Sequence, residues 1–425
     1  MRTHVAALGL ALVATSAVAH ASPEDVFGFG ARTMALGATG AAHAEGYEAV
    51  YANPALLSTT RARQLTLGVA GAMFDLRAET PTGGGRLSYE ALRGTFIGAA
   101  LPVPFGGVLK DRIAVGLGFF TPFGLVVRGR ILYPERPQFL LADRTQSVAV
   151  QAAVGVHVVR GLRVGAGFAA LAALTGDVAV GTDASGRIGT VVEDTLVASY
   201  GPILGASYDL GDWRVGAAFR GELVGRFTVV ITARDLGEIV VPPLHISGIA
   251  QYDPWQVAAE VARVTGPWRF AVGVTYKHWS AYPGPAEATV RCDFENPQCD
   301  ALVPPDPDFH DTVVPRLGVE RVVAWTQSAE GRLRAGYFLE PTPSPEQTGD
   351  GNLFDNTRSA LTLGYGLALA APLPPVELDV FGQLHVLHPR THEKDGAVAA
   401  TNAGAPRTET HGLIVAGGFT AGVRF

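Results

Sequence analysis

The stretch Phe27-Gly-Phe-Gly-Ala-Arg-Thr-Met-Ala-Leu-Gly-Ala-Thr-Gly40, continued through an alanine-rich tract to Asn53-Pro54-Ala55, decides how the chain must fold. It is rich in glycine and alanine and almost uncharged. Its glycines allow tight backbone turns and the close approach of other groups. The tract 41–52 favours one or two helical turns that stop before the proline, because proline disfavours helix in the preceding residue. Such a segment cannot form a core alone, which predicts a plug enclosed by something larger.

The composition indicates where that enclosure lies. Hydrophobic residues make up 48% of the 425 residues and charged residues 17%, against about 25% charged in a typical soluble domain. Outside the N-terminus no run of about 18 apolar residues occurs, which excludes helical membrane spans. High apolarity without long apolar runs is typical of a membrane β-barrel, whose strands alternate lipid-facing and inward residues. The net charge of −6 does not indicate the basic surface that nucleic-acid binding requires.

Residues 1–21 have the pattern of a secretory signal. Arg2 is followed by a short apolar stretch and then by Ala19-His20-Ala21, which predicts cleavage after Ala21. The alternative, an N-terminal membrane anchor, is disfavoured because the apolar core is short. No cysteine follows the cleavage site, which disfavours a lipoprotein anchor. We therefore expect an exported protein whose plug comprises residues 22–64 and whose barrel comprises residues 65–425.

Fourteen segments with period-two character follow the plug, and this is the per-segment signature of an outer-membrane barrel. They cover residues 65–78, 87–100, 112–121, 145–159, 162–175, 195–209, 213–231, 244–263, 267–280, 312–325, 331–340, 357–370, 375–388 and 411–425. In the segment 213–231, the alternation places Val215, Phe219 and Leu223 toward lipid and Arg220 toward the lumen. The pattern predicts an all-β fold, a 14-stranded antiparallel transmembrane barrel with a small plug that contains short helical turns.

The connections between these segments alternate in length. Those after the fourth, sixth, eighth, tenth and twelfth segments are short, and those after the odd segments from the third onward are longer and more polar. Periplasmic turns and extracellular loops produce this alternation, which places both termini and the plug on the periplasmic side. Trp213, Trp268 and Trp325 then lie beside short turns, where an aromatic girdle belongs. Pro254 fits its strand only at a bulge, and the chain ends in Phe425, as outer-membrane barrels usually do.

The plug carries a family resemblance. Its Phe27-Gly-x-Gly start, its Met34-Ala-Leu-Gly-x-x-Gly element and its Asn53-Pro-Ala end resemble the long-chain fatty-acid and aromatic-hydrocarbon transporters of Gram-negative outer membranes. Pro122-Phe-Gly and Trp279-Ser follow the same family pattern in order along the chain. Leu56 departs from it, because the family usually has glycine after Asn-Pro-Ala. The resemblance implies a hatch that plugs a 14-stranded barrel, and a monomer in contact with outer-membrane lipid and lipopolysaccharide.

The resemblance also implies how such a barrel works and which residues take part. Hydrophobic small molecules, such as long-chain fatty acids or aromatic hydrocarbons, move passively through an inner pocket, past the hatch and out through a lateral opening. The implied positions are Phe27 and Phe29 near the pocket, Asn53, Pro54 and Ala55 holding the hatch against the wall, and Gly116, Gly118 and Pro122 at a kink in the third strand, where glycine and proline weaken ladder pairing. The alternatives are that the two phenylalanines only pack the hatch and that Asn53 only caps a turn.

Four inward basic residues are candidates for binding a carboxylate head group. They are Arg214, Arg220, Arg226 and Lys277. The alternative is a lumenal network of ion pairs, which is the more frequent use of inward charges in a barrel. Cys292 and Cys299 predict a disulfide, because two nearby cysteines in an exported protein usually pair. A metal site at these cysteines, completed by residues of the 306–311 stretch, is the alternative.

The sequence gives little support for an enzymatic function. The glycines after Phe27 follow no strand and lack the spacing of a dinucleotide-binding loop, and no G-x-S-x-G nucleophile elbow occurs. His385 and His388 differ by three residues, which on a strand sends them to opposite faces. We expect no enzyme, no cofactor and no metal. Two other functions remain open, a secretion or surface scaffold of the same fold that carries no solute, and a general porin for polar solutes.

Overall fold

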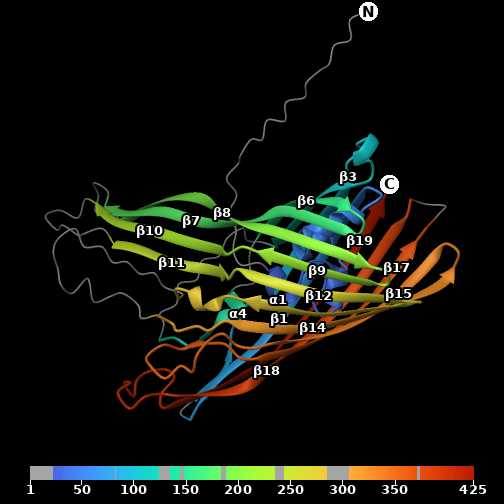
Figure 1. Cartoon of the computed structure of the whole chain (residues 1–425). Coiled ribbons are helices and arrows are strands. Elements are labelled where there is room, and N and C mark those ends of the chain that lie inside the picture. The colour runs from blue at the N-terminus through green and yellow to red at the C-terminus, as the bar shows by residue number, and fades with distance from the viewer. Residues whose placement is uncertain are drawn as a thin grey trace, which may run out of the picture.

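The computed structural model describes residues 23–81, 83–123, 135–143, 148–182, 188–234, 244–284, 306–370 and 374–425. Seventeen of the described strands form one sheet that closes on itself (Figure 1). In chain order they are β1 Gln64–Thr80, β2 Gly83–Leu87 with β3 Leu92–Pro102, β4 Ile113–Pro122, β6 Ala149–Val159, β7 Leu162–Thr182, β8 Ile188–Leu210, β9 Trp213–Arg220 with β10 Leu223–Arg234, β11 Leu244–Asp253 with β12 Gln256–Thr265, β13 Trp268–Lys277, β14 Thr312–Thr326, β15 Ala329–Glu340, β17 Arg358–Leu369, β18 Val376–Glu393 and β19 Arg407–Arg424.

These strands make a closed, antiparallel barrel of fourteen strands, with β2–β3, β9–β10 and β11–β12 each counted as one. Neighbours in chain order pair, and β1 pairs with β19 from Gln64 opposite Arg424 to Glu79 opposite Glu409, which closes the ring. Each of the fourteen segments expected from the sequence contains one of these strands, so the predicted fold is confirmed. None of the helices in the described ranges is long and apolar enough to cross a membrane.

Two strands are interrupted. Pro254 and Trp255 separate β11 from β12, so the proline lies at a break in its strand. Gly221 and Glu222 separate β9 from β10, and beyond them β10 leaves β8 and runs parallel to β7. The hairpin of β7 and β8 extends with β10 and β11 away from the barrel body (Figure 1). Leu223 is buried, so its predicted lipid-facing position is wrong, because the chain leaves the strand at Gly221 and Glu222 and the alternation resumes in β10 with the opposite phase.

The outer surface follows the alternation elsewhere. On β19, Leu413, Val415 and Phe419 are exposed, while Ile414 between them is fully buried. The three tryptophans that the sequence placed beside short turns are exposed at the ends of β9, β13 and β14. An apolar band with aromatic residues at its edge is the surface that a membrane barrel presents to lipid.

The N-terminal residues 23–59, called the hatch from here on, lie inside the barrel (Figure 1). Their elements are α1 Pro23–Phe27, α2 Ala31–Ala35, η1 Gly46–Glu48, α3 Ala49–Ala52 and η2 Pro54–Thr59. Gly28 and Gly30 turn the chain between α1 and α2 with φ of 94° and 89°, a conformation that other residues rarely adopt. Helix α3 ends before Asn53-Pro54, as the proline predicts. The hatch is therefore a set of short turns that depends on the wall for its packing.

Short elements outside the ladder cover the other end of the lumen. Strand β5 Gln138–Phe139 precedes α4 Leu140–Asp143 and pairs in parallel with β16 Leu353–Phe354. Of the other short helices, η4 Trp279–Ala281 follows β13 at this end, whereas η3 Gly107–Leu109 lies in the β3–β4 connection at the periplasmic end. The pairing of β5 with β16 joins two long extracellular connections, so the described loops close over the barrel opposite the hatch.

Inward-facing glycines let the wall approach the hatch closely. A Cβ atom added at Gly205 would lie 2.0 Å from Oδ1 of Asn53, and one added at Gly216 would lie 2.0 Å from the carbonyl oxygen of Ala41. Further wall glycines where an added Cβ would lie under 3.0 Å from a hatch atom are Gly98, Gly116, Gly118, Gly155, Gly165, Gly318, Gly336 and Gly364. They come from most sides of the barrel, so the hatch is packed against a ring of positions that accept no side chain.

We expect Gly216→Ala to loosen the hatch, because its Cβ would displace the backbone of Ala41 rather than a flexible side chain. Overpacking of this kind costs about 1–3 kcal/mol. The measurement is the thermal unfolding of the purified protein in detergent. Gly382→Ala is the matched control, because its Cβ would meet only the Ala416 carbonyl oxygen, at 4.0 Å. Equal melting temperatures for the two variants would contradict this role of Gly216.

Candidate functional site

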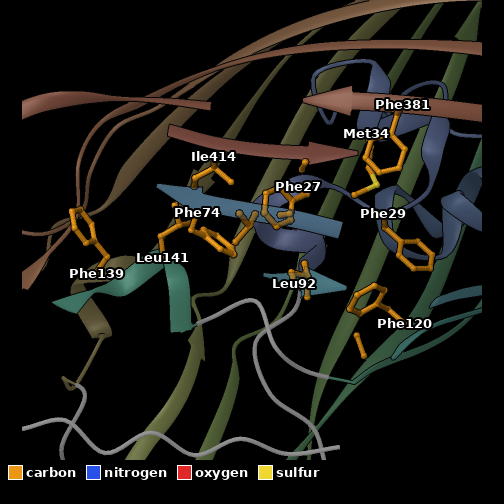
Figure 2. Packing of buried hydrophobic residues seen from close by; sticks show 14 of the residues in the cluster. Phe27, Phe29, Met34, Phe74, Leu92, Phe120, Phe139, Leu141, Phe381 and Ile414 are labelled. Atoms are coloured by element: carbon orange, nitrogen blue, oxygen red, sulfur yellow. The ribbon is translucent and has the colours of Figure 1, made fainter. Parts of the chain in front are cut away.

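A continuous cluster of aromatic and aliphatic side chains fills the lumen from the extracellular loops to the hatch (Figure 2). Phe29 packs edge-on against Tyr47 and Phe96, with ring centroids 5.6 and 5.7 Å away. Phe96 continues the contact to Phe120 at 4.9 Å. Phe27 lies in the same cluster, edge-on to the ring of His385 at 5.4 Å. Both hatch phenylalanines are only 1% exposed, so they pack the hatch as well as line the interior.

The cluster continues to the loops that cover the extracellular end. Phe139 on β5 and Phe354 on β16 belong to it, with ring centroids 6.0 Å apart. The backbone N–H of Phe139 donates to the hydroxyl of Tyr89 at 2.7 Å, which ties β5 to the barrel connection before β3. Figure 2 shows Phe139 and Leu141 on one side of Phe27, and Phe29 and Phe120 on the other. An apolar molecule that entered beneath these loops would therefore meet apolar side chains down to the hatch.

Two small cavities lie between the hatch and the wall. One has a volume of about 40 Å³ and is lined by Phe29 and Thr33 from the hatch and by Arg316 from the wall. The other, of about 20 Å³, reaches Gln151 on β6. Both are lined by Tyr51, Arg220 and Gln256. A volume of 40 Å³ is on the scale of one or two water molecules. A larger ligand therefore needs part of the hatch to move.

Arg220 lies at the junction of these cavities. Its guanidinium donates to the Tyr51 carbonyl oxygen at 3.2 Å and to Oε1 of Gln256 at 2.9 Å, and it lies over the Tyr51 ring at 4.4 Å. Its Nε is buried and has no hydrogen-bond partner. No carboxylate among the described side chains forms an ion pair with Arg220. The site thus holds a positive charge with one donor free.

The other predicted basic residues are used differently. Arg214 pairs with Asp209, on the neighbouring strand at the periplasmic mouth. Lys277 is fully buried and donates to Asp25 of the hatch at 3.0 Å and to Glu340 at 2.6 Å. Both therefore match the ion-pair alternative. The backbone of Arg226 lies in β10, but its side chain lies outside the described part of the structure.

Arg316 on β14, which was not among the predicted site residues, lines the larger of the two cavities. Its guanidinium donates to the Thr275 hydroxyl at 3.3 Å and lies 4.9 Å from the Phe338 ring centre. The described side chains give Arg316 no ion pair either. The signal that would have found it is its inward position between Val314 and Gly318 in an alternating segment.

Glu24, on α1, lines the same cavity, and neither of its carboxyl oxygens has a hydrogen-bond partner. Burial, helped by the nearby carboxylates of Asp253 and Asp25, raises the pKa of Glu24 to about 8. At pH 7 this carboxyl group is therefore mainly neutral, and it does not offset the charge of Arg220.

Two wall carboxylates hold the middle of the hatch. Glu260 on β12 accepts hydrogen bonds from the backbone N–H groups of Gly40, Ala41 and Ala42, at 2.8, 3.2 and 3.0 Å. Glu320 on β14 accepts from Arg32 of the hatch, with its Oε2 3.0 Å from Nε of the arginine. Charge-assisted hydrogen bonds are about twice as strong as neutral ones. These contacts fix the hatch segment that faces the periplasm.

Asn53 has both of the roles considered from the sequence. Its Nδ2 donates to the Ala206 carbonyl oxygen of β8 at 3.0 Å, which ties the hatch to the wall. Its Oδ1 accepts from the Ala55 N–H at 3.1 Å, which caps η2. Pro54 and Ala55 are buried, and Pro54 lies against the wall at Gly155 and Gly165.

The third barrel strand runs without a register shift. Strand β4 pairs evenly with β3 up to Pro122 and with β6 up to Phe120. Gly116 faces Val50 and Leu57 of the hatch, and Gly118 faces Phe29, so close packing gives a second reason for both glycines. A lateral opening at Gly116, Gly118 and Pro122 stays a prediction.

A third cavity, of about 370 Å³, lies on the periplasmic side of the hatch. It is lined by Arg32, His43 and Glu45 of the hatch and by wall residues that include Trp213, Arg263 and Arg269. Glu45 accepts from Arg269 at 2.6 Å. Its lining combines charged and apolar side chains, and the hatch separates it from the apolar cluster.

The predicted disulfide and the predicted absence of a metal site concern residues that lie partly outside the described ranges. Cys292 and Cys299 fall in 285–305, so their disulfide stays a prediction. In the described ranges, no group of three or more His, Cys, Asp or Glu side chains is placed to hold a metal ion. His385 is buried and His388 is exposed, on opposite faces of β18.

A barrel with an apolar band outside, a buried hatch inside and an apolar lumen is an outer-membrane transport barrel. The sequence matches the family described as outer membrane protein transport protein (OMPP1/FadL/TodX) over residues 10–424. The chain therefore belongs to this family of outer-membrane channels for hydrophobic compounds in Gram-negative bacteria. The family and its solved members are transport channels and not enzymes.

Solved structures share the fold at low sequence identity. A FadL homologue of Pseudomonas aeruginosa has a TM-score of 0.60 and 14% identity, with 93% of this chain and 96% of that chain covered. The toluene transporters TodX of P. putida and TbuX of Ralstonia pickettii both have a TM-score of 0.55, with 14% and 17% identity respectively. Each comparison covers 94% of this chain and 99% of the transporter chain. No curated protein matches the sequence.

We expect Glu260→Ala to release the middle of the hatch, because three backbone N–H groups lose their common acceptor. Each unsatisfied buried donor costs about 1–3 kcal/mol. The measurement is the rate of trypsin cleavage after Arg32, which is 5% exposed when the hatch is seated. Glu330→Gln is the control, because Glu330 pairs with Arg332 and does not touch the hatch. Cleavage as slow as in the wild type would contradict the anchoring role of Glu260.

Proposed function

We propose that this channel carries hydrophobic molecules with an anionic head group, such as long-chain fatty acids, passively across the outer membrane. The observation that carries this proposal is Arg220, a lumenal guanidinium without a carboxylate partner, next to Phe29 and Tyr51. A carboxylate matches the geometry of a guanidinium and its free N–H donor. The aromatic cluster beside it suits an apolar tail.

Charge distinguishes this class of ligand from a plain hydrocarbon. A hydrocarbon offers no acceptor, so it would leave the Nε donor of Arg220 unpaired. Arg316 adds a second guanidinium to the same cavity. Related solved proteins include transporters named for toluene, so an aromatic hydrocarbon is the alternative solute.

The route that we propose has three stages. The solute enters the aromatic cluster beneath the loops that contain β5 and β16, and it reaches Arg220 when α1, with Phe27, moves aside. It then leaves through a lateral opening near Gly116, Gly118 and Pro122 of β4, and no cofactor takes part. A general porin is disfavoured, because buried apolar side chains fill the lumen above the hatch.

We expect Arg220→Gln to weaken the binding of palmitate by about tenfold to a hundredfold, because a hydrogen bond to a charged group contributes about 1.5–3 kcal/mol. Isothermal titration of the purified protein measures this loss. Arg214→Gln is the matched control, because Arg214 already pairs with Asp209 and lies at the periplasmic mouth. Unchanged palmitate affinity in Arg220→Gln would contradict the proposed head-group site.

The class of solute and the transport role are tested separately. Mass spectrometry of ligands that co-purify from native membranes compares the wild type with a variant that lacks residues 22–30. Amphiphiles retained only by the wild type support a pocket that depends on the hatch. Toluene uptake that survives Arg220→Gln, without palmitate binding by the wild type, selects the hydrocarbon alternative. No ligand in either protein, with no uptake defect on gene deletion, leaves the scaffold.

A further inference from the structure

Four adjacent strands, β9, β12, β13 and β14, present an apolar outer face that is interrupted only at the periplasmic end. All four are described in full, and each pairs with the next. The side chains on their outward faces are Trp213, Val215, Ala217 and Phe219 on β9, Val257, Ala259, Val261, Arg263 and Thr265 on β12, Trp268, Phe270, Val272, Val274 and Tyr276 on β13, and Val313, Pro315, Leu317, Val319, Arg321, Val323 and Trp325 on β14. Arg263 and Arg321 are the only charged residues among them.

Each of these two arginines is stacked on a tryptophan. The guanidinium carbon of Arg263 lies 4.9 Å from the centre of the Trp213 ring, and these residues are direct cross-strand partners. The guanidinium of Arg321 lies 5.1 Å from the Trp268 ring, again across directly paired positions. Trp268 in turn stacks on Phe270, with ring centroids 6.0 Å apart and planes inclined by 13°. Aromatic and guanidinium groups thus alternate around this side of the barrel.

Neither guanidinium has an acidic partner in the described structure. Two inward arginines of the same strands do: Arg214 pairs with Asp209 and Arg269 with Glu45. An arginine that faces lipid is tolerated near the membrane interface and disfavoured at the midplane. The tryptophans mark that interface. Stacking occupies the face of a guanidinium and leaves the N–H donors along its edge free.

We propose that Arg263 and Arg321 bind the phosphate groups of anionic phospholipids in the periplasmic leaflet, with Trp213 and Trp268 holding the guanidiniums in place. A phosphate presents the planar pair of acceptor oxygens that an arginine edge matches. The short turns beside Trp213 and Trp268 put this surface on the periplasmic side. The arginines lie two strands apart, which separates them by about 10 Å across the sheet, so each takes its own phosphate. This site lies at the periplasmic rim of the barrel, where Trp213 and Arg263 also border the periplasmic cavity, and it is separate from the apolar cluster that would hold the solute.

The test is native mass spectrometry of the full-length protein released from detergent with added phosphatidylglycerol or phosphatidylcholine of the same acyl chains. We expect the wild type to retain phosphatidylglycerol preferentially. Arg263→Gln and Arg321→Gln each reduce this retention about fivefold, the effect of one basic residue at an anionic membrane surface. Trp213→Leu and Trp268→Leu, which leave the charges in place, reduce it less.

The matched control is Arg77→Gln. Arg77 is an exposed arginine at the opposite, extracellular end of β1 and already pairs with Asp75 at 3.4 Å, so phosphatidylglycerol retention stays at the wild-type level. Heat-modifiable migration on electrophoresis establishes that every variant has folded. Equal retention of the two lipids by the wild type overturns the proposal, as does full phosphatidylglycerol retention by both arginine variants.

Discussion

Every backbone N–H and C=O group that crosses lipid must find its partner within the protein, and the pairing of β1 with β19 supplies the last of these partners. Closure removes the sheet edges, but it also creates a lumen that must be filled or left to water. The wall cannot fill it alone, because many inward positions are glycine. The hatch does so, and its backbone lies against glycines such as Gly205 and Gly216. The lumen is therefore filled only because small wall residues and the Gly/Ala-rich hatch pack closely against each other.

The filled lumen has two different interiors. Toward the periplasm, charges are paired in networks such as Arg32 with Glu320 and Arg334 with Glu320. Toward the extracellular side, aromatic rings meet one another from Phe29 to Phe120. Removing one partner from a buried ion pair leaves an uncompensated charge, which is strongly destabilising. The periplasmic half of the hatch is thus fixed in place, whereas the other half is held by apolar packing and by the ion pair of Asp25 with Lys277.

The sequence predicted the strands well and the chemistry of the lumen only in part. Inside–outside alternation is a local property, so each predicted segment contains one strand. Leu223 was misplaced because the alternation changes phase at Gly221 and Glu222, where β10 leaves β8 for a long-range pairing with β7. Arg220 and Lys277 look equivalent in sequence, but Lys277 meets Asp25 and Glu340, which are 252 and 63 residues away. Periodicity gives the direction of a side chain, and only the fold gives its partners.

The position of Arg220 relative to α1 links the proposed head-group site to the hatch. Gln256 accepts from Arg220 at 2.9 Å and donates to Asp25 at 3.0 Å, so one side chain separates the guanidinium from a hatch carboxylate. An anionic head group at Arg220 would place a second negative charge near Asp25, and like charges at this range repel. Lys277 would keep Glu340 as its partner if Asp25 withdrew, so its charge would stay compensated. Arrival of the anion therefore weakens the hold on α1 alone, while Glu260 still anchors the rest of the hatch.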